Sequence, residues 1–150
     1  MNYKSKNVED THKLASVVAS ILSGGDIVLL NGDLGAGKTT FVKALAKALG
    51  IKENVTSPTF TLLKTYKSNR YNIVHVDAYR LEGDEFSELD DYLNDENVIF
   101  IEWSSLLTSS LINEALLIDI TYISKNQRMF TIHSNSKHYQ EYVEEIEKNV

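Results

Sequence analysis

The chain has 150 residues, 43% of them hydrophobic and 24% charged, which is typical of a folded globular domain rather than a disordered chain. It has no cysteine, which excludes disulfides and thiolate metal sites and agrees with a reducing compartment, so we expect a cytoplasmic protein and oxygen ligands for any metal. No apolar run approaches the roughly 18 residues of a membrane-spanning helix. The net charge of −6 argues against independent, tight binding to nucleic acid, because Lys and Arg contacts to phosphate dominate that affinity.

Helices and strands alternate in the first third of the chain. Residues 8–22 repeat apolar side chains at the spacing of a helix buried on one side, and Gly24 and Gly25 follow as stop residues with positive φ. Residues 26–31 form a short apolar run, typical of a strand covered on both faces in a parallel sheet. Residues 39–49 combine apolar positions with alanines and lysines, which predicts a second helix.

Strands dominate the remainder. An extended turn at Pro58 precedes two predicted strands that pair across a polar turn, and an acidic stretch with a short helix around Leu89, Tyr92 and Leu93 follows. Three more strands and a charged terminal helix complete the pattern, which predicts a single α/β domain with a mixed β-sheet flanked by helices. The predicted strands are residues 59–66, 71–76, 98–101, 116–123 and 128–133, and the helix is residues 137–148.

Residues 32–39 match the phosphate-loop pattern G-x-x-x-x-G-K-[ST] without a gap, between a predicted strand and a predicted helix. The glycines permit torsions that turn successive N–H groups inward, and the helix adds its positive N-terminal end. Lys38 supplies a charge for the β- and γ-phosphates, and the Thr39 hydroxyl is a ligand for Mg²⁺. We therefore predict a P-loop NTPase-like fold that binds ATP and Mg²⁺. The predicted nucleotide contacts in the loop are Asp33, Gly35, Ala36, Gly37, Lys38, Thr39 and Thr40.

Such a site also needs a carboxylate on the metal side, usually at the end of a buried strand. Glu102 directly follows an apolar strand and fits this arrangement, although a solvent-facing glutamate has the same sequence pattern. Asp77 ends the preceding strand and is a second candidate, either to orient the attacking water or to hold a metal-bound water. His75 in that strand is expected to be a packed core histidine rather than a base. Arg80 and Trp103 have plain alternatives, a surface ion pair and a core aromatic.

Four segments in this order resemble the TsaE family, the bacterial ATPases of tRNA threonylcarbamoyladenosine biosynthesis. The segments are residues 32–41, residues 57–60 (SPTF), residues 75–81 (HVDAYRL) and residues 101–104 (IEWS), and the similarity extends over about residues 8–132. The resemblance implies an ATPase that acts with TsaB and TsaD, the complex that transfers threonylcarbamoyl to the adenosine next to the anticodon. It thereby implies that tRNA is reached only through this complex.

The resemblance also assigns roles to single residues. It implies that Asp77 and Glu102 are the catalytic and Mg²⁺-linked acids, and that Trp103 lies near the phosphates. It further implies a nucleotide-sensing switch at residues 57–59. Thr11 would lie near the nucleotide base, with a further base contact near Gln127.

Other functional classes remain open at this point. In a non-catalytic, nucleotide-gated binding module, Asp77 and Glu102 would only order a switch. A small-molecule kinase is disfavoured because the region after Gly83 is acidic rather than arginine-rich, and a GTPase because the N-K-x-D segment is absent. The sequence contains no obvious arginine finger. Arg80 and Arg128 are the candidates, and the alternative is a site that a partner completes. We predict the latter, and therefore slow hydrolysis by the isolated protein.

Overall fold

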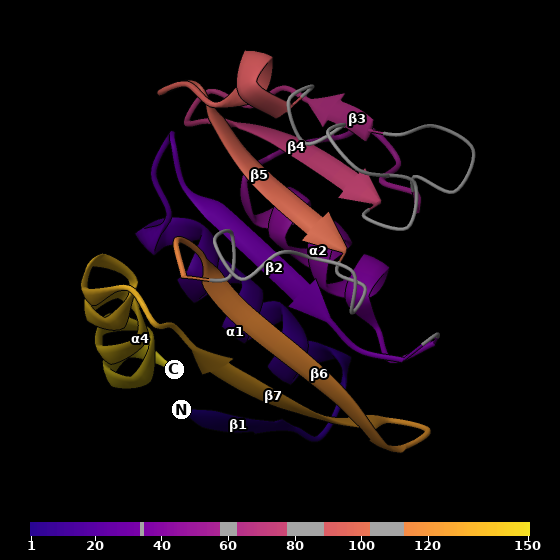
Figure 1. Cartoon of the computed structure of the whole chain (residues 1–150). Helices are drawn as coiled ribbons and strands as arrows, with labels where there is room; N and C mark the ends of the chain where they lie inside the picture. The colour runs from indigo at the N-terminus through magenta and orange to yellow at the C-terminus, as the bar shows by residue number, and fades with distance from the viewer. Residues whose placement is uncertain (34, 58–62, 78–88, 103–112) are drawn as a thin grey trace.

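The computed structural model describes residues 1–33, 35–57, 63–77, 89–102 and 113–150. Within these residues, seven strands form one sheet and three α-helices are present (Figure 1). The strands are β1 (Asn2–Ser5), β2 (Ile27–Asn31), β3 (Leu63–Tyr66), β4 (Asn72–Asp77), β5 (Asn97–Glu102), β6 (Leu116–Ser124) and β7 (Gln127–His133). The helices are α1 (Val8–Ile21), α2 (Lys38–Ala48) and α4 (Lys137–Asn149).

The sheet is parallel in its centre and antiparallel towards both edges, in the order β1-β7-β6-β2-β5-β4-β3. Strand β2 lies between β6 and β5 and is parallel to both, and β4 is parallel to β5. The pairs β1–β7, β6–β7 and β3–β4 are antiparallel. Because β2, β4 and β5 run in the same direction, their carboxyl ends meet at one edge of the sheet, where the phosphate loop begins.

The core lies on both faces of the central strands. Val28, Leu30 and Phe100 belong to the larger apolar cluster, which includes the inner faces of α1 and α2, whereas Leu29 and Ile99 belong to a second cluster on the opposite face. This alternation confirms the prediction that residues 26–31 are covered on both sides. Figure 1 shows α1 and α2 behind the sheet, and α4 packs against α1 and β7.

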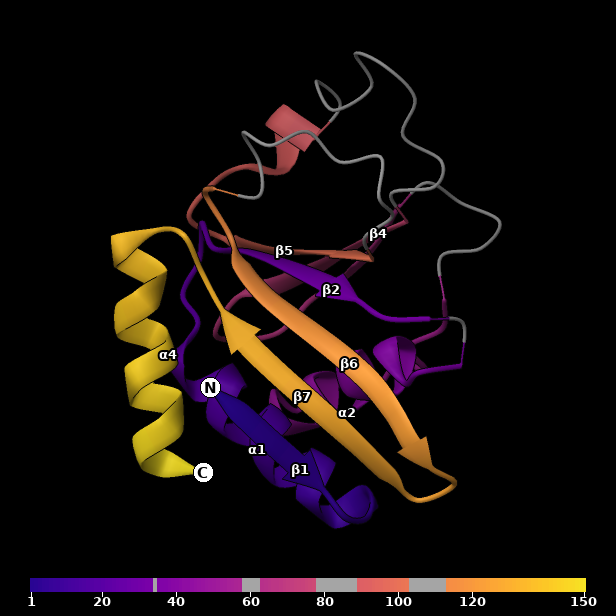
Figure 2. The same cartoon turned by 60° about the horizontal axis from the view of Figure 1, so that its bottom comes forward.

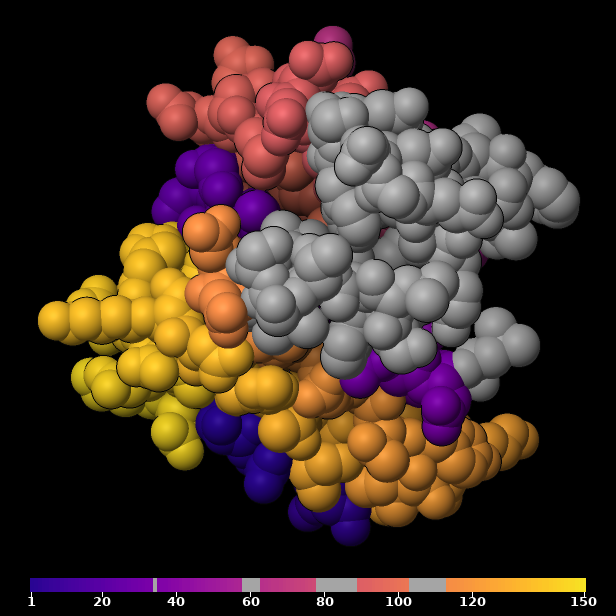
Figure 3. Space-filling model, viewed as in Figure 1, coloured from indigo at the N-terminus to yellow at the C-terminus, as the bar shows by residue number. Residues whose placement is uncertain are grey.

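The chain termini, helix α4 and the β6–β7 hairpin lie at the outside of the molecule. The two termini lie close together beside β1 and α4 (Figure 2). Helix α4 forms one side of the molecule in the space-filling view (Figure 3), and the β6–β7 hairpin projects beyond the end of β2 (Figure 2). None of the helices described is long and apolar enough to cross a lipid bilayer. The predicted α/β fold, a mixed sheet flanked by helices, is confirmed.

Three details differ from the sequence-based expectations. Strand β1 was not predicted. It pairs with β7, and Met1 extends this pairing because its carbonyl oxygen accepts a 2.9 Å bond from the Ile132 amide. Of the two glycines after α1, Gly25 has a positive φ of 98°, whereas Gly24 is required by close packing, since a Cβ there would lie 1.6 Å from the Asp95 carbonyl oxygen. The short helix expected near Leu89 is a 3₁₀ turn at residues 89–92.

Candidate functional site

The phosphate loop connects the carboxyl end of β2 to the first turn of α2. Gly35 and Gly37 have positive φ angles of 81° and 111°, which glycine adopts at little cost. The Ala36 amide donates to the Asp33 carbonyl oxygen over 2.9 Å and closes a turn inside the loop. Gly32 lies against β6, where a Cβ would be 2.7 Å from the Ile120 carbonyl oxygen. The glycines of the motif are therefore required by torsion and by packing.

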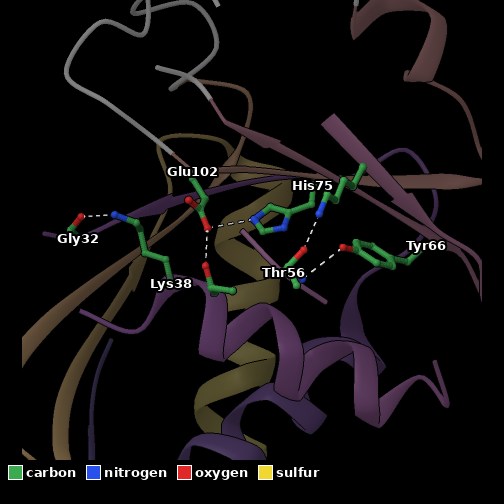
Figure 4. Close-up of polar contacts among 8 residues, drawn as sticks. Gly32, Lys38, Thr56, Tyr66, His75 and Glu102 are labelled. Atoms are coloured by element: carbon green, nitrogen blue, oxygen red, sulfur yellow. Dashed lines mark hydrogen bonds and ion pairs between the residues drawn. The ribbon is translucent and has the colours of Figure 1, made fainter. Parts of the chain in front are cut away.

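The two side chains predicted to contact phosphate and metal, Lys38 and Thr39, begin helix α2. The Lys38 ammonium donates to the Gly32 carbonyl oxygen at 2.5 Å, so it lies across the loop (Figure 4). The Thr39 hydroxyl donates to Oε1 of Glu102 over 3.1 Å. The residue before them, Gly37, has no side chain to cap the helix, so the first backbone N–H groups of α2 remain suited to an anion.

Glu102 ends β5 and is 8% exposed. Its Oε1 also lies 3.1 Å from Nε2 of His75, which is fully buried in β4 (Figure 4). Burial raises the pKa of the Glu102 carboxyl, but the hydrogen bonds from His75 and Thr39 and the charge of Lys38 outweigh burial and hold this pKa below its ordinary value. The solvent-facing interpretation of Glu102 is therefore wrong, because the carboxylate points to the first turn of α2.

Asp77 lies at the same edge of the sheet. It ends β4, and the parallel register pairs it directly with Glu102 on β5. Side chains two positions apart on a strand lie on the same face of the sheet. Glu102 lies two positions after Phe100, and Asp77 lies two positions after its register partner His75. The side chains of Glu102 and Asp77 therefore lie on the α2 side of the sheet. The structure thus brings together Lys38 and Thr39 with the end of β5 and, on the neighbouring strand, Asp77.

Some predicted site residues lie outside the described part of the chain. These are Trp103, Arg80 and positions 58–59 of the expected switch. The residue before that switch, Thr56, is tied to β3, because its hydroxyl accepts a hydrogen bond from Lys64 and its amide donates to the Tyr66 hydroxyl (Figure 4).

A surface hollow lies beside the phosphate loop, between the start of α1 and the β6–β7 hairpin. Thr11 is 7% exposed and lines this hollow, and its hydroxyl is hydrogen-bonded to the Ser5 hydroxyl over 2.7 Å. In the described part of the chain the wall includes the neighbours of Gln127 rather than Gln127 itself. The structure therefore places Thr11 next to the loop, and its contact with the nucleotide base stays a prediction. The lining residues are Asn7, Val8, Thr11, Ala36, Gly37, Thr40, Lys125, Asn126, Arg128 and Phe130.

Arg128 joins the hairpin to the phosphate loop, a role that the sequence did not indicate. Its Nε donates to the Ala36 carbonyl oxygen over 2.8 Å, and its Nη1 donates to the carbonyl oxygens of Ser124 and Gln127 over 2.7 and 2.9 Å. The guanidinium also lies 4.6 Å from the centre of the Tyr122 ring. In a trans peptide the N–H points away from the C=O, so fixing the Ala36 carbonyl also fixes the direction of the Gly37 N–H.

The donor chemistry at Thr39 and Glu102 fits a hard divalent cation. A hydroxyl and a carboxylate oxygen are the ligands that Mg²⁺ prefers, and Mg²⁺ usually takes its other ligands from phosphate and water. Among the residues described, no group of three or more His, Cys, Asp or Glu side chains gathers into a separate metal site. The cradle of N–H groups at Gly35 and Gly37 fits phosphate oxygens next to this donor pair.

Comparison with known proteins places the chain in a family. A relative from Bacillus subtilis, "tRNA threonylcarbamoyladenosine biosynthesis protein TsaE", is 36% identical over 150 residues, covering 99% of this chain and 95% of the relative. The Rickettsia felis protein of the same name is 43% identical over 134 residues, covering 87% of this chain and 78% of the relative. The crystal structure of Bacillus subtilis YdiB superimposes with a TM-score of 0.82 at 34% identity, covering 99% of this chain and 94% of that one. This likeness confirms the predicted P-loop NTPase-like fold. The family model for "Threonylcarbamoyl adenosine biosynthesis protein TsaE" matches residues 5–130, and the chain belongs to the TsaE family.

Proposed function

We propose that this protein binds ATP with Mg²⁺ and hydrolyses it as the nucleotide-dependent subunit of tRNA threonylcarbamoyladenosine modification. In this role it acts with TsaB and TsaD in the cytoplasm and reaches tRNA through their complex. Membership of the TsaE family supports the process. The observation that carries the hydrolytic part is the 3.1 Å contact between Thr39 and Glu102, because it joins the phosphate loop to a metal-side carboxylate.

Phosphate binding falls to the loop and the first turn of α2. The N–H groups at Gly35 and Gly37 and the N-terminus of α2 face the β- and γ-phosphates. Lys38 exchanges the Gly32 carbonyl oxygen for phosphate oxygens, which are better partners for an ammonium group because they are charged. Arg128 keeps the Ala36 peptide in the orientation that directs the Gly37 N–H towards the anion.

The two acidic residues have different roles in the proposed reaction: Glu102 binds the metal and Asp77 orients the attacking water. Mg²⁺, held by Thr39 and Glu102, would supply positive charge that neutralises the charge developing on the phosphates during transfer. Thr39 and Glu102 hold the metal side, and the lowered pKa of Glu102 keeps its carboxylate ionised for that role. Asp77, in register with Glu102 on the next strand, orients the attacking water by accepting a hydrogen bond from it. The hollow lined by Thr11 receives the adenine base.

Hydrolysis by the isolated chain should be slow. In-line phosphoryl transfer gains most of its rate from cations around the transferred group. Lys38 supplies one such cation, whereas Arg128 already bonds backbone carbonyl oxygens through Nε and Nη1. We therefore expect TsaB and TsaD to complete or order the charge stabilisation.

Phosphate release by wild type, Lys38→Ala and Glu102→Ala, each with and without TsaB and TsaD, separates an ATPase from a nucleotide-gated module. An ATPase predicts that Glu102→Ala still binds ATP and loses hydrolysis, while Lys38→Ala loses both. Equal release from the three proteins would rule out hydrolysis at this site. Wild-type release that TsaB and TsaD leave unchanged would contradict the proposed partnership. ADP formation that requires a small acceptor would instead indicate a kinase.

A further inference from the structure

We propose that His75 is a positioning residue for Glu102, holding the carboxylate in the place where it receives the metal ion. This inference rests on the proposed function, because it assigns Glu102 to the metal side. His75 lies in β4 and Glu102 in β5, and His75 Nε2 is 3.1 Å from Glu102 Oε1. The same oxygen accepts the hydroxyl of Thr39, so one atom of the carboxylate joins β4, β5 and α2.

The sheet register sets this geometry. His75 pairs with Phe100, and Glu102 lies two positions further along β5, which places both side chains on the face covered by α2. His75 is fully buried and Glu102 is 8% exposed. Water therefore competes little for their contact, and the imidazole ring has few other positions available. Figure 4 shows His75 and the first turn of α2 on two sides of the Glu102 carboxylate.

The hydrogen-bond pattern indicates which nitrogen carries the hydrogen. An ionised carboxylate only accepts hydrogen bonds, so the hydrogen of the imidazole is on Nε2. The other ring nitrogen, Nδ1, is buried and has no hydrogen-bond partner among the residues described. An unpaired buried polar atom costs folding free energy, which an apolar side chain of similar shape would avoid. A role for Nε2 in the site explains why a histidine occupies this position in the core.

Glu102 needs a positioning partner because its side chain is flexible and because it would lose its contact with Thr39 when the metal binds. A glutamate side chain has three rotatable bonds, and the Thr39 hydroxyl that now contacts it must turn to the metal in the proposed complex. The His75 bond remains available during that exchange and keeps the carboxylate aimed at α2. Partners that orient a metal ligand in this way typically change metal affinity by about 10 to 100-fold when they are removed.

Two variants with side chains similar in length to histidine distinguish a hydrogen-bonding role of His75 from a space-filling role. His75→Gln keeps an N–H donor at the position of Nε2, and His75→Met keeps the bulk without a donor. The measurements are fluorescent ADP titration in EDTA and binding of Mn²⁺ to the ADP complex by electron paramagnetic resonance. We expect ADP affinity in EDTA to stay at the wild-type value in both variants, about 10-fold weaker Mn²⁺ binding in His75→Met, and recovery of most of that loss in His75→Gln.

The outcomes distinguish this inference from the proposed function. If Glu102→Gln loses Mn²⁺ affinity while His75→Met keeps it, the metal role of Glu102 stands and the role of His75 is wrong. Equal losses of Mn²⁺ affinity in His75→Gln and His75→Met would also contradict the proposed role of His75. The shape of the histidine side chain, rather than its hydrogen bond, would then be the cause. If Glu102→Gln itself keeps the wild-type Mn²⁺ affinity, the proposed function fails first.

A spectroscopic measurement that needs no substitution at His75 covers the case in which the His75 variants do not fold. The ¹⁵N spectrum of His75 should show the hydrogen on Nε2, and the Nε2 resonance should shift in Glu102→Gln and on addition of Mg²⁺ with ADP. A hydrogen found on Nδ1, or a resonance that neither change moves, would contradict the proposed contact.

Discussion

Thr39 Oγ1 donates a 3.1 Å hydrogen bond to Glu102 Oε1 and so joins the first turn of α2 to the end of β5. These two oxygens are also the protein ligands that we assign to Mg²⁺. If Mg²⁺ binds as proposed, each of these oxygens would bond the cation in place of their direct hydrogen bond. In the proposed complex, a contact that now joins two elements of the fold would instead bind the nucleotide complex.

Replacing Thr39 with valine removes the hydroxyl and keeps the branched shape. We expect Thr39→Val to bind ADP with wild-type affinity in EDTA. The factor by which Mg²⁺ increases this affinity should be about 10-fold smaller than in wild type, because one of two protein ligands is missing. Thr39→Ser keeps the hydroxyl and is the matched control. Nucleotide titration with and without Mg²⁺ measures both. A Mg²⁺-dependent gain that Thr39→Val retains in full would show that the hydroxyl is not a ligand.

Arg128 should affect nucleotide binding in the absence of metal. Arg128→Lys keeps the charge but cannot bond the Ala36 carbonyl oxygen and the hairpin carbonyl oxygens at once, because lysine lacks the planar fork. We expect ADP affinity in EDTA to fall about 10-fold, equivalent to about 1.4 kcal/mol of binding free energy. Arg70→Lys is the control, since Arg70 bonds the Ser20 carbonyl oxygen of α1 instead. Wild-type affinity in Arg128→Lys would mean that charge alone suffices.

Two glycine positions at opposite ends of β2 test the packing of the loop. A Cβ at Gly32 would lie 2.7 Å from the Ile120 carbonyl oxygen, and a Cβ at Gly24 would lie 1.6 Å from that of Asp95. We expect both Gly32→Ala and Gly24→Ala to lower the free energy of unfolding by about 1–3 kcal/mol, measured with urea. ADP affinity should fall only in Gly32→Ala. An equal fall in both would indicate a general loss of structure rather than displacement of the loop.

The lowered pKa of Glu102 predicts a pH-dependent stability. A carboxyl with a depressed pKa in the folded state stabilises the fold above its ordinary value of 4.5, and this contribution is lost as pH falls through the folded-state pKa. The difference in unfolding free energy between wild type and Glu102→Gln should therefore shrink between neutral and acidic pH. Urea unfolding in EDTA at several pH values measures this difference. A difference that grows on acidification would contradict the assigned shift.

The sequence predicted most of the fold because its signals are local. The strand, glycine loop and helix at residues 26–49 follow from a continuous apolar run, a motif and a helical period that need no information from distant residues. Strand β1 was missed because Asn2–Ser5 is polar and lies at the edge of the sheet, so one apolar face is not visible in four residues.

The site was predictable only where a residue type carries its own chemistry. Lys38 and Thr39 follow from the motif, and Glu102 from its place after an apolar strand. The contact of His75 with Glu102 depends on the register between β4 and β5, and that of Arg128 with Ala36 on the β6–β7 hairpin lying beside the loop. Both depend on strand order, which single-sequence patterns do not specify.

Repeated modification of tRNA in a reconstituted reaction tests the central claim most directly. The reaction contains this protein, TsaB, TsaD, ATP, Mg²⁺, a threonylcarbamoyl donor and tRNA, and modified adenosine per complex is counted over time. We predict many turnovers with wild type, and few or none with Lys38→Ala or with Glu102→Ala, the latter despite bound ATP. Equal turnover with wild type, Lys38→Ala and no added protein would contradict the account.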